Sequence, residues 1–121
     1  MNRVWAALLL TIVGATPVIA GTLATGWTIP ATVAVRTGNI AFIYFPLTSR
    51  AGTPPACAAN IGGTNFRYAL DISTAGGRSQ LALLVTSIAS GTGVFFQGAG
   101  TCTFDASTED LAVTELPGPG Q

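Results

Sequence analysis

One stretch in the second half of the chain, residues 73–91, carries the pattern that most restricts the fold. Four apolar side chains recur there at intervals of three and four residues, which is the spacing of one face of an α-helix. They are Leu81, Leu84, Val85 and Ile88. Ser73 is a suitable N-cap, and Gly91 stands where a left-handed residue would end the helix. Gly76 and Gly77 weaken the first turns by roughly 1 kcal/mol each relative to alanine. We therefore expect tertiary packing to stabilise this helix.

The segments on both sides of this helix are typical of β-strands, most of them alternating and residues 40–45 apolar on both faces. Three such runs precede it and two or three follow it. They are residues 31–37, 40–45 and 66–72, then 92–97, 101–104 and 111–116. Gly38-Asn39 predicts a two-residue hairpin turn. A short, mostly antiparallel sheet must protect its edges. The sequence therefore predicts a mainly β domain with one helix (α+β), a small five-stranded OB-like Greek-key barrel with the helix between strands 3 and 4. An open sheet with the helix across one face is the alternative.

The N-terminus has the features of an export signal. Arg3 precedes an apolar run, and Val18 and Ala20 stand at the −3 and −1 positions that signal peptidase accepts. The run is too short for a stable membrane span, and a retained N-terminal anchor is the alternative. We expect cleavage after Ala20 and a secreted or periplasmic bacterial protein. The predicted parts are a signal peptide at 1–20, a single domain at 21–116 and a flexible tail at 117–121.

The chain contains two cysteines, Cys57 and Cys102. In an exported protein such a pair predicts one disulfide. The bond would enclose 46 residues, contribute about 4 kcal/mol and hold the long connection at 46–63 in place. Metal ligation is the alternative, but two distant thiols in a chain without histidine do not make a zinc site.

Charge and residue types exclude several classes of function. Charged residues make up 8% of the chain, far below the usual share of about 25%. Beyond Arg3, four arginines stand against five acidic residues, a net charge of −1, so we expect no nucleic-acid partner. Without histidine there is no Ser–His or Cys–His pair. We predict no enzyme, no cofactor and no metal, with a small hydrolase as the least favoured alternative. Asp105, Glu109 and Asp110 are interpreted as a solvated loop rather than a calcium site.

A surface with so few charges is poorly protected against association, so we expect a homo-oligomer. A second helix face, small and mildly polar, is the candidate for the contact between copies. Its residues are Gln80, Leu83, Ser87 and Ser90.

The run from residue 66 to residue 116 resembles a known family. It contains a strand (FRYALDI), a long helix, a strand followed by a turn (GVFFQGAGTC) and a final strand introduced by EDLAVTEL. This order is similar to that of the OB-fold B subunits of AB5-type bacterial toxins, the pertussis-like and subtilase-cytotoxin-like kinds. It also resembles small exported bacterial proteins of unassigned function. The residues that match the latter are Asp71, Ser73, Thr74, Gly77, Arg78, Gly98, Gly100 and Cys102.

The resemblance implies a ring, usually a pentamer, that binds host glycans and carries an enzymatic partner subunit. No sugar-binding motif falls on particular positions of this chain, so no site residue is transferred to it. We predict a secreted or periplasmic, non-enzymatic binding module that acts as an oligomer and recognises carbohydrate. The alternative is a periplasmic structural, interaction or inhibitor-type protein that binds another protein.

Overall fold

The computed structural model describes residues 21–58 and 63–118. The predicted signal peptide and the last three residues of the predicted tail lie outside this range. The described chain is mainly β with one helix, as predicted. Its elements are β1 (Leu23–Ala24), β2 (Thr32–Arg36), β3 (Ile40–Pro46), the 3-10 helix η1 (Leu47–Ser49), β4 (Arg50–Ala51), β5 (Asn65–Asp71), α1 (Ala75–Ser90), β6 (Phe95–Gly98) and β7 (Leu111–Glu115).

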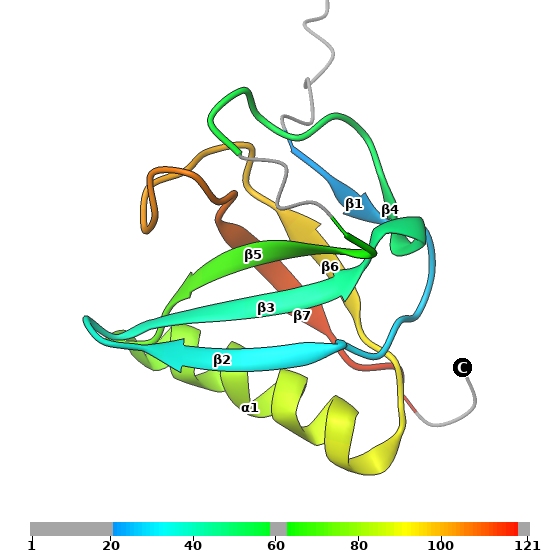
Figure 1. Cartoon of the computed structure of the whole chain (residues 1–121). Coiled ribbons are helices and arrows are strands. Elements are labelled where there is room, and N and C mark those ends of the chain that lie inside the picture. Colours follow the sequence, from blue (N-terminus) through cyan, green and yellow to red (C-terminus); the bar gives the residue numbers. More distant parts are fainter. Residues whose placement is uncertain (1–20, 59–62, 119–121) are drawn as a thin grey trace, which may run out of the picture.

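The strands form two sheets rather than one closed barrel (Figure 1). One sheet has the order β4-β1-β6-β7 and the other β2-β3-β5, and the pairs within both are antiparallel. Isolated bridges join the sheets, an antiparallel one from Thr28 to Val94 and a parallel one from Ala69 to Asp110. The prediction of a closed barrel was therefore wrong. The chain passes from one sheet to the other between β1 and β2, where Pro30 has no N–H to donate to a strand ladder.

Two local predictions about the strands also need correction. The turn between β2 and β3 covers residues 37–39, because Arg36 pairs with Ile40. Both Gly38 and Asn39 have positive φ, 87° and 61°. Residues 101–104, predicted as a strand, are irregular. The backbone N–H groups of Thr103 and Phe104 donate to a side-chain carboxylate instead of a neighbouring strand.

The N-cap of the helix lies one residue later than predicted. Its N-cap is Thr74, whose hydroxyl oxygen accepts a hydrogen bond from Gly77 N at 3.0 Å. Ser73, the predicted N-cap, instead donates its N–H and its hydroxyl to Asp71 Oδ1. Gly91 ends the helix with φ 70°, as predicted.

The buried face of α1 differs from the predicted stripe. Leu84 is fully buried and Leu81 packs against the core, but Val85 and Ile88 are 50% and 43% exposed. Gly77 and Ser87 are buried instead. The prediction was thus right for two of the four residues. The helix packs on β5 and β7 with Gly77 and Ser87 buried in place of Val85 and Ile88.

The core lies between the two sheets and is largely aromatic. Phe45, Phe66, Tyr68 and Phe96 come from β3, β5 and β6 and are at most 3% exposed. The rings of Phe45 and Phe96 stack with their centroids 4.1 Å apart. Since such pairs are stabilised by both area and ring geometry, this cluster fixes how the two sheets face each other.

Candidate functional site

A pocket of about 250 Å³ opens beside the end of β5 that Phe66 and Arg67 occupy. Segments far apart in the sequence line it, namely η1, β4 and the following loop, β5, and residues 107–109. The lining side chains are Leu47, Arg50, Pro54, Ala58, Phe66, Arg67, Ser107, Thr108 and Glu109. Two of the four arginines beyond Arg3 are in this group.

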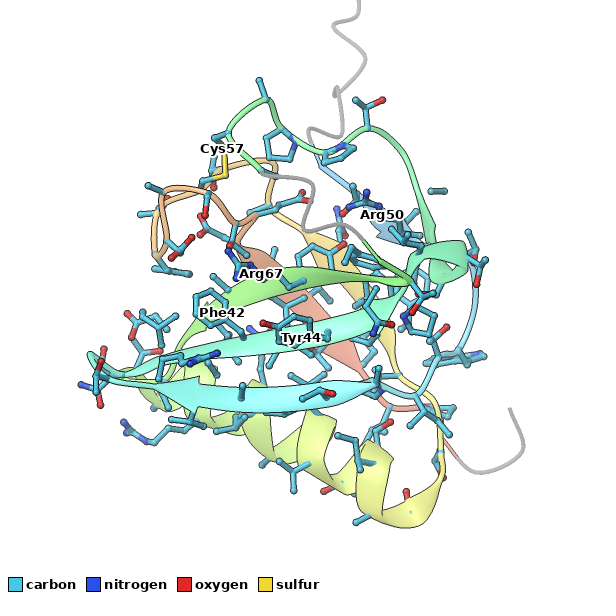
Figure 2. All side chains as sticks on the ribbon, in the orientation of Figure 1. Phe42, Tyr44, Arg50, Cys57 and Arg67 are labelled. Carbon is cyan, nitrogen blue, oxygen red and sulfur yellow. A yellow bond between two sulfur atoms is a disulfide. The ribbon has the colours of Figure 1, made fainter. Side chains whose placement is uncertain are left out.

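Arg67 is held in one orientation by contacts on several sides. Its Nε donates to Thr108 Oγ1 at 2.8 Å, and one terminal nitrogen donates to Ser107 Oγ at 3.2 Å. The guanidinium lies over the Phe42 ring, 4.7 Å from the centroid (Figure 2). Asp105 lies 3.9 Å from the same terminal nitrogen. A planar cation fixed in this way presents its remaining donors in a defined direction.

Asp105 organises the loop that holds Arg67. Its Oδ1 accepts hydrogen bonds from Ser107 N, Ser107 Oγ and Thr108 Oγ1 at 2.9–3.0 Å. The backbone N–H of Ser107, followed by its hydroxyl, lowers the pKa of Asp105, and Arg67 adds to this. The carboxylate therefore stays ionised to a lower pH than a free aspartate.

Arg50 differs from Arg67 because no carboxylate of the described residues lies within ion-pair distance of it. Its guanidinium lies 4.5 Å from the centroid of the Phe66 ring. Within residues 21–58 and 63–118 the ion pair that forms is Arg67 with Asp105, so Arg50 has no acidic partner there. Arg50 is half-buried. The pocket thus contains one cation in an ion pair, Arg67, and one outside any ion pair of the described residues, Arg50.

Glu109 lines the pocket but is buried, and it does not lie in a solvated loop. It is 2% exposed. Oε1 accepts hydrogen bonds from Thr22 N and Gly100 N at 3.0 and 3.1 Å, and Oε2 accepts one from Thr22 Oγ1 at 2.8 Å. Thr22 Oγ1 is also hydrogen-bonded to the Tyr68 hydroxyl. Burial raises the pKa of Tyr68 well above its usual range, so this hydroxyl keeps its proton.

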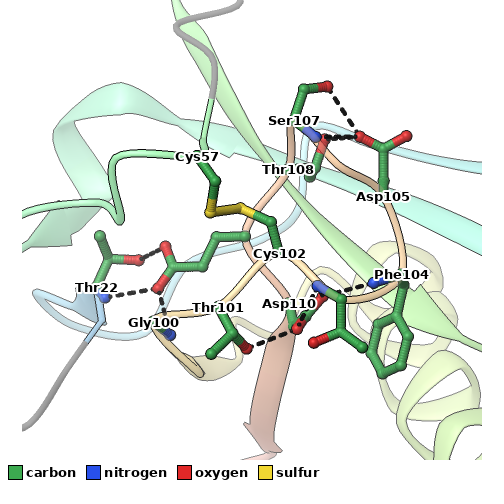
Figure 3. The surroundings of a disulfide bond; sticks show 12 residues. Thr22, Cys57, Gly100, Thr101, Cys102, Phe104, Asp105, Ser107, Thr108 and Asp110 are labelled. Atoms are coloured by element: carbon green, nitrogen blue, oxygen red, sulfur yellow. Dashed lines mark hydrogen bonds between the residues drawn. A yellow bond between two sulfur atoms is a disulfide. The ribbon is translucent and has the colours of Figure 1, made fainter.

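Asp110 is buried too, and the prediction of a solvated acidic loop was wrong for both residues. Asp110 is 4% exposed and accepts hydrogen bonds from Thr101 Oγ1, Thr103 N and Phe104 N at 2.7–3.1 Å (Figure 3). Burial alone would raise the pKa of Asp110, but these hydrogen bonds outweigh it and the pKa is lowered. The carboxylate replaces the strand pairing that residues 101–104 lack.

The predicted disulfide between Cys57 and Cys102 is confirmed, with the two Cα atoms 6.2 Å apart (Figure 3). It joins the loop after β4 to the turn after β6. The first of these loops supplies Pro54 and Ala58 to the pocket. The disulfide therefore holds one pocket wall against the part of the fold that carries Asp110.

The structure does not place the four predicted helix-interface residues on one exposed face. Ser87 is fully buried, and its hydroxyl donates to the carbonyl of Thr92. The Gln80 amide donates to Ala112 O on β7, at 3.4 Å. Leu83 is half-buried, and Ser90 is exposed. The exposed apolar side chains of α1 include Val85 and Ile88 instead.

Sequence reasoning missed Arg50, Arg67 and the burial of Glu109. Arg67 had one usable signal, because it occupies an outward position on a strand and Phe42, which lies under it, is outward on the neighbouring strand. No local pattern marks Arg50. The donors that surround Glu109 come from residues 22 and 100, which no spacing rule connects.

Comparisons with known proteins give no family for this chain. No protein-family model matches it, no curated protein matches it, and no solved structure matches it. The resemblance to toxin B subunits therefore stays a prediction. Among the described residues, no helix is both long enough and apolar enough to cross a bilayer.

Proposed function

We propose that this chain is an exported, non-enzymatic binding module whose ligand site is the pocket of Arg50 and Arg67. The observation that carries the proposal is Arg50, a half-buried cation that stacks on Phe66 and has no acidic partner within the described residues. A guanidinium in this state has N–H donors left for a ligand anion. An anionic group of a ligand would supply the missing counter-charge.

The remaining lining of the pocket indicates what the anion is attached to. Leu47 and Pro54 offer apolar surface, and the hydroxyl of the half-buried Ser107 also lines the pocket. A ligand with an anionic group, an apolar ring face and several hydroxyls matches all three kinds of surface. Acidic glycans have these features, and this agrees with the carbohydrate recognition that the toxin resemblance implies.

The hydrogen bonds that the acidic side chains accept support a role without catalysis. Asp105, Glu109 and Asp110 each accept at least three hydrogen bonds inside the protein. A carboxylate fixed in this way is poorly placed to move a proton to or from a substrate.

We further propose that the two sheets are an open form of the OB-like Greek-key barrel. The order of strand neighbours supports this. Strands β2, β3 and β5 pair in that order, and the Ala69–Asp110 bridge joins β5 to the residue just before β7, which pairs with β6. The Thr28–Val94 bridge then leads back to the segment that connects β1 with β2. A five-stranded, partly open barrel has this circular order of neighbours.

Export to an oxidising compartment fits the disulfide. It also accords with the signal peptide that we propose for residues 1–20. A homo-oligomer fits the exposed apolar side chains, which include Val35 at 59% and Val85 at 50% exposure, on a chain with 8% charged residues. Sedimentation velocity of the oxidised mature protein tests this part, because a monomer at high concentration contradicts it.

The binding proposal is tested by titration calorimetry and a glycan array with the wild type, Arg50→Gln and the control Arg36→Gln. Arg36 is exposed at the end of β2 and does not line the pocket. We expect acidic glycans to bind the wild type and the control alike, and Arg50→Gln to lose at least tenfold in affinity. Equal binding by all three proteins, or a preference for neutral glycans, contradicts the proposed site.

The alternative, a protein that docks on a partner enzyme, has one observation in its favour. Trp27 is 46% exposed with its ring edge against Phe95, and Ile29 nearby in sequence is 42% exposed. Aromatic side chains of this kind are enriched in protein interfaces. A neighbouring gene for a secreted enzyme would favour a toxin-like pair, and its absence favours this alternative. Trp27→Ala would weaken such docking and leave glycan binding unchanged.

A further inference from the structure

The buried carboxylate of Glu109 has hydrogen-bond donors but, among the described residues, no cation in direct contact. Its partners are two backbone N–H groups and one hydroxyl. Within the described residues no arginine forms an ion pair with it. Three donors are the arrangement expected around an ionised carboxylate. A buried charge is costly unless an opposite charge also lies close by.

Residue 21 is packed directly against this carboxylate. Gly21 has φ 135°, a backbone conformation that residues other than glycine rarely adopt. An ideal Cβ on it would lie 2.6 Å from Gly98 O, 2.8 Å from Gly100 N and 2.9 Å from Glu109 Oε1. No larger residue fits here. The position demands glycine because the backbone itself approaches the carboxylate.

We propose that cleavage between Ala20 and Gly21 completes this site, and that the new α-ammonium group of Gly21 is the counter-ion of Glu109. The inference rests on the export proposed above. A signal peptidase hydrolyses the amide with one water molecule, which leaves a carboxylate on Ala20 and an ammonium group on Gly21. Cleavage thus turns a neutral amide nitrogen into a positive charge beside a buried negative one.

The distances allow this ion pair without rearrangement of the fold. The amino nitrogen and the ideal Cβ of Gly21 are bonded to the same Cα, so they are about 2.5 Å apart. The nitrogen therefore lies within roughly 5–6 Å of Glu109 Oε1, given the 2.9 Å from that Cβ position. Opposite charges at ~4–6 Å each favour the ionised form of the other. Cleavage also removes the bond that ties this nitrogen to residue 20.

The ion pair would act on the ligand pocket through the backbone. Glu109 follows Thr108, whose hydroxyl accepts a hydrogen bond from Arg67. The carbonyl of Glu109 accepts from Ala69 N at the junction of the two sheets. Signal cleavage would therefore stabilise the pocket wall as well as remove the leader.

The composition of the chain makes the proposal directly measurable. All five basic residues are arginines, so a chain that begins at Gly21 has its α-amino group as the sole primary amine. An amine-acylating reagent or NMR of the terminal nitrogen then reports that group alone. Two proteins are compared with the disulfide intact, one that begins at Gly21 and one that begins at Ala20. The added alanine moves the ammonium group by about 3.8 Å.

We expect the α-amino pKa of the Gly21 protein to lie at least half a unit above the usual value of about 7.7–8.0. We expect the Ala20 protein to show the usual value. Acylation near pH 7 is then at least threefold slower for Gly21, because less free amine is present. A pKa raised in the folded state adds stability below about pH 8 that is lost as pH rises through the folded pKa. The denaturation midpoints of the two proteins should therefore differ at pH 6–7 and converge at high pH.

Glu109→Gln, made in both proteins, should remove the difference between them. Equal α-amino pKa values in the two wild-type proteins overturn the ion pair, and this readout remains decisive if Glu109→Gln does not fold. N-terminal sequencing of the exported protein must return Gly21, and any other first residue overturns the maturation step. Glycan titration of the Gly21 protein is a separate measurement, so a failure of the proposed binding function is distinguishable from a failure of this inference.

Discussion

Two adjacent glycines at the start of α1, Gly76 and Gly77, should respond in opposite ways to alanine. An ideal Cβ on Gly76 meets no heavy atom within 4 Å. Gly76→Ala should therefore stabilise the protein by about 0.5–1 kcal/mol, the usual gain in an exposed helix. On Gly77 the same Cβ would lie 1.7 Å from Asp71 O and 3.1 Å from Thr74 Oγ1. The carbonyl oxygen of Asp71 cannot move aside without the rest of the strand, because Asp71 belongs to β5.

The loss of stability expected for Gly77→Ala is the sum of three free-energy contributions. Overpacking against backbone costs about 1–3 kcal/mol. Displacement of Thr74 weakens the N-cap hydrogen bond to Gly77 N, worth about 1 kcal/mol. The alanine propensity gain offsets about 1 kcal/mol. Gly77→Ala should thus destabilise the protein by about 1–3 kcal/mol, and the two variants should differ by about 1.5–4 kcal/mol.

Urea denaturation followed by circular dichroism, with the disulfide intact, measures both variants under one set of conditions. The midpoints should lie on opposite sides of the wild type with an unchanged m-value. A Gly77→Ala protein as stable as Gly76→Ala would refute the close approach of α1 to the end of β5. It would also remove the explanation for the rotation of the helix.

The remaining predictions concern the disulfide and the buried acid Asp110. The double variant Cys57→Ser/Cys102→Ser should lose about 4 kcal/mol, from the 45-residue separation of the cysteines, and also lose affinity for acidic glycans. Unchanged binding would show that the disulfide does not shape the pocket. Because the folded pKa of Asp110 is lowered, its stabilisation is present above pH ~4 and is lost as the pH falls through the folded value. Asp110→Asn should therefore flatten the acid limb of a stability–pH curve, whereas Glu115→Gln, exposed at the end of β7, should not; equal curves for all three proteins would contradict this role.

Sequence alone determined the features that depend on neighbours along the chain. The continuous apolar run at residues 40–45 and the alternation in residues 66–72 located β3 and β5 within one or two residues. The three-to-four spacing located α1, and Gly91 marked its end because left-handed backbone favours glycine. The two cysteines had one possible pairing within the chain, which is why the disulfide followed from a count.

Tertiary structure decided every feature that depends on where unrelated backbone groups arrive. Val85 and Leu84 are equally apolar, yet only Leu84 is buried, because the contact at Gly77 fixes the rotation of α1. Glu109 looks like part of a solvated loop until Thr22 and Gly100 bring their N–H groups to it. Arg50 becomes a candidate ligand contact only because folding places it over Phe66 in the pocket, where it forms no ion pair with a carboxylate of the described residues. A charged side chain acquires its role from the donors, rings and counter-charges that folding brings to it, and these come from parts of the chain that no local pattern connects.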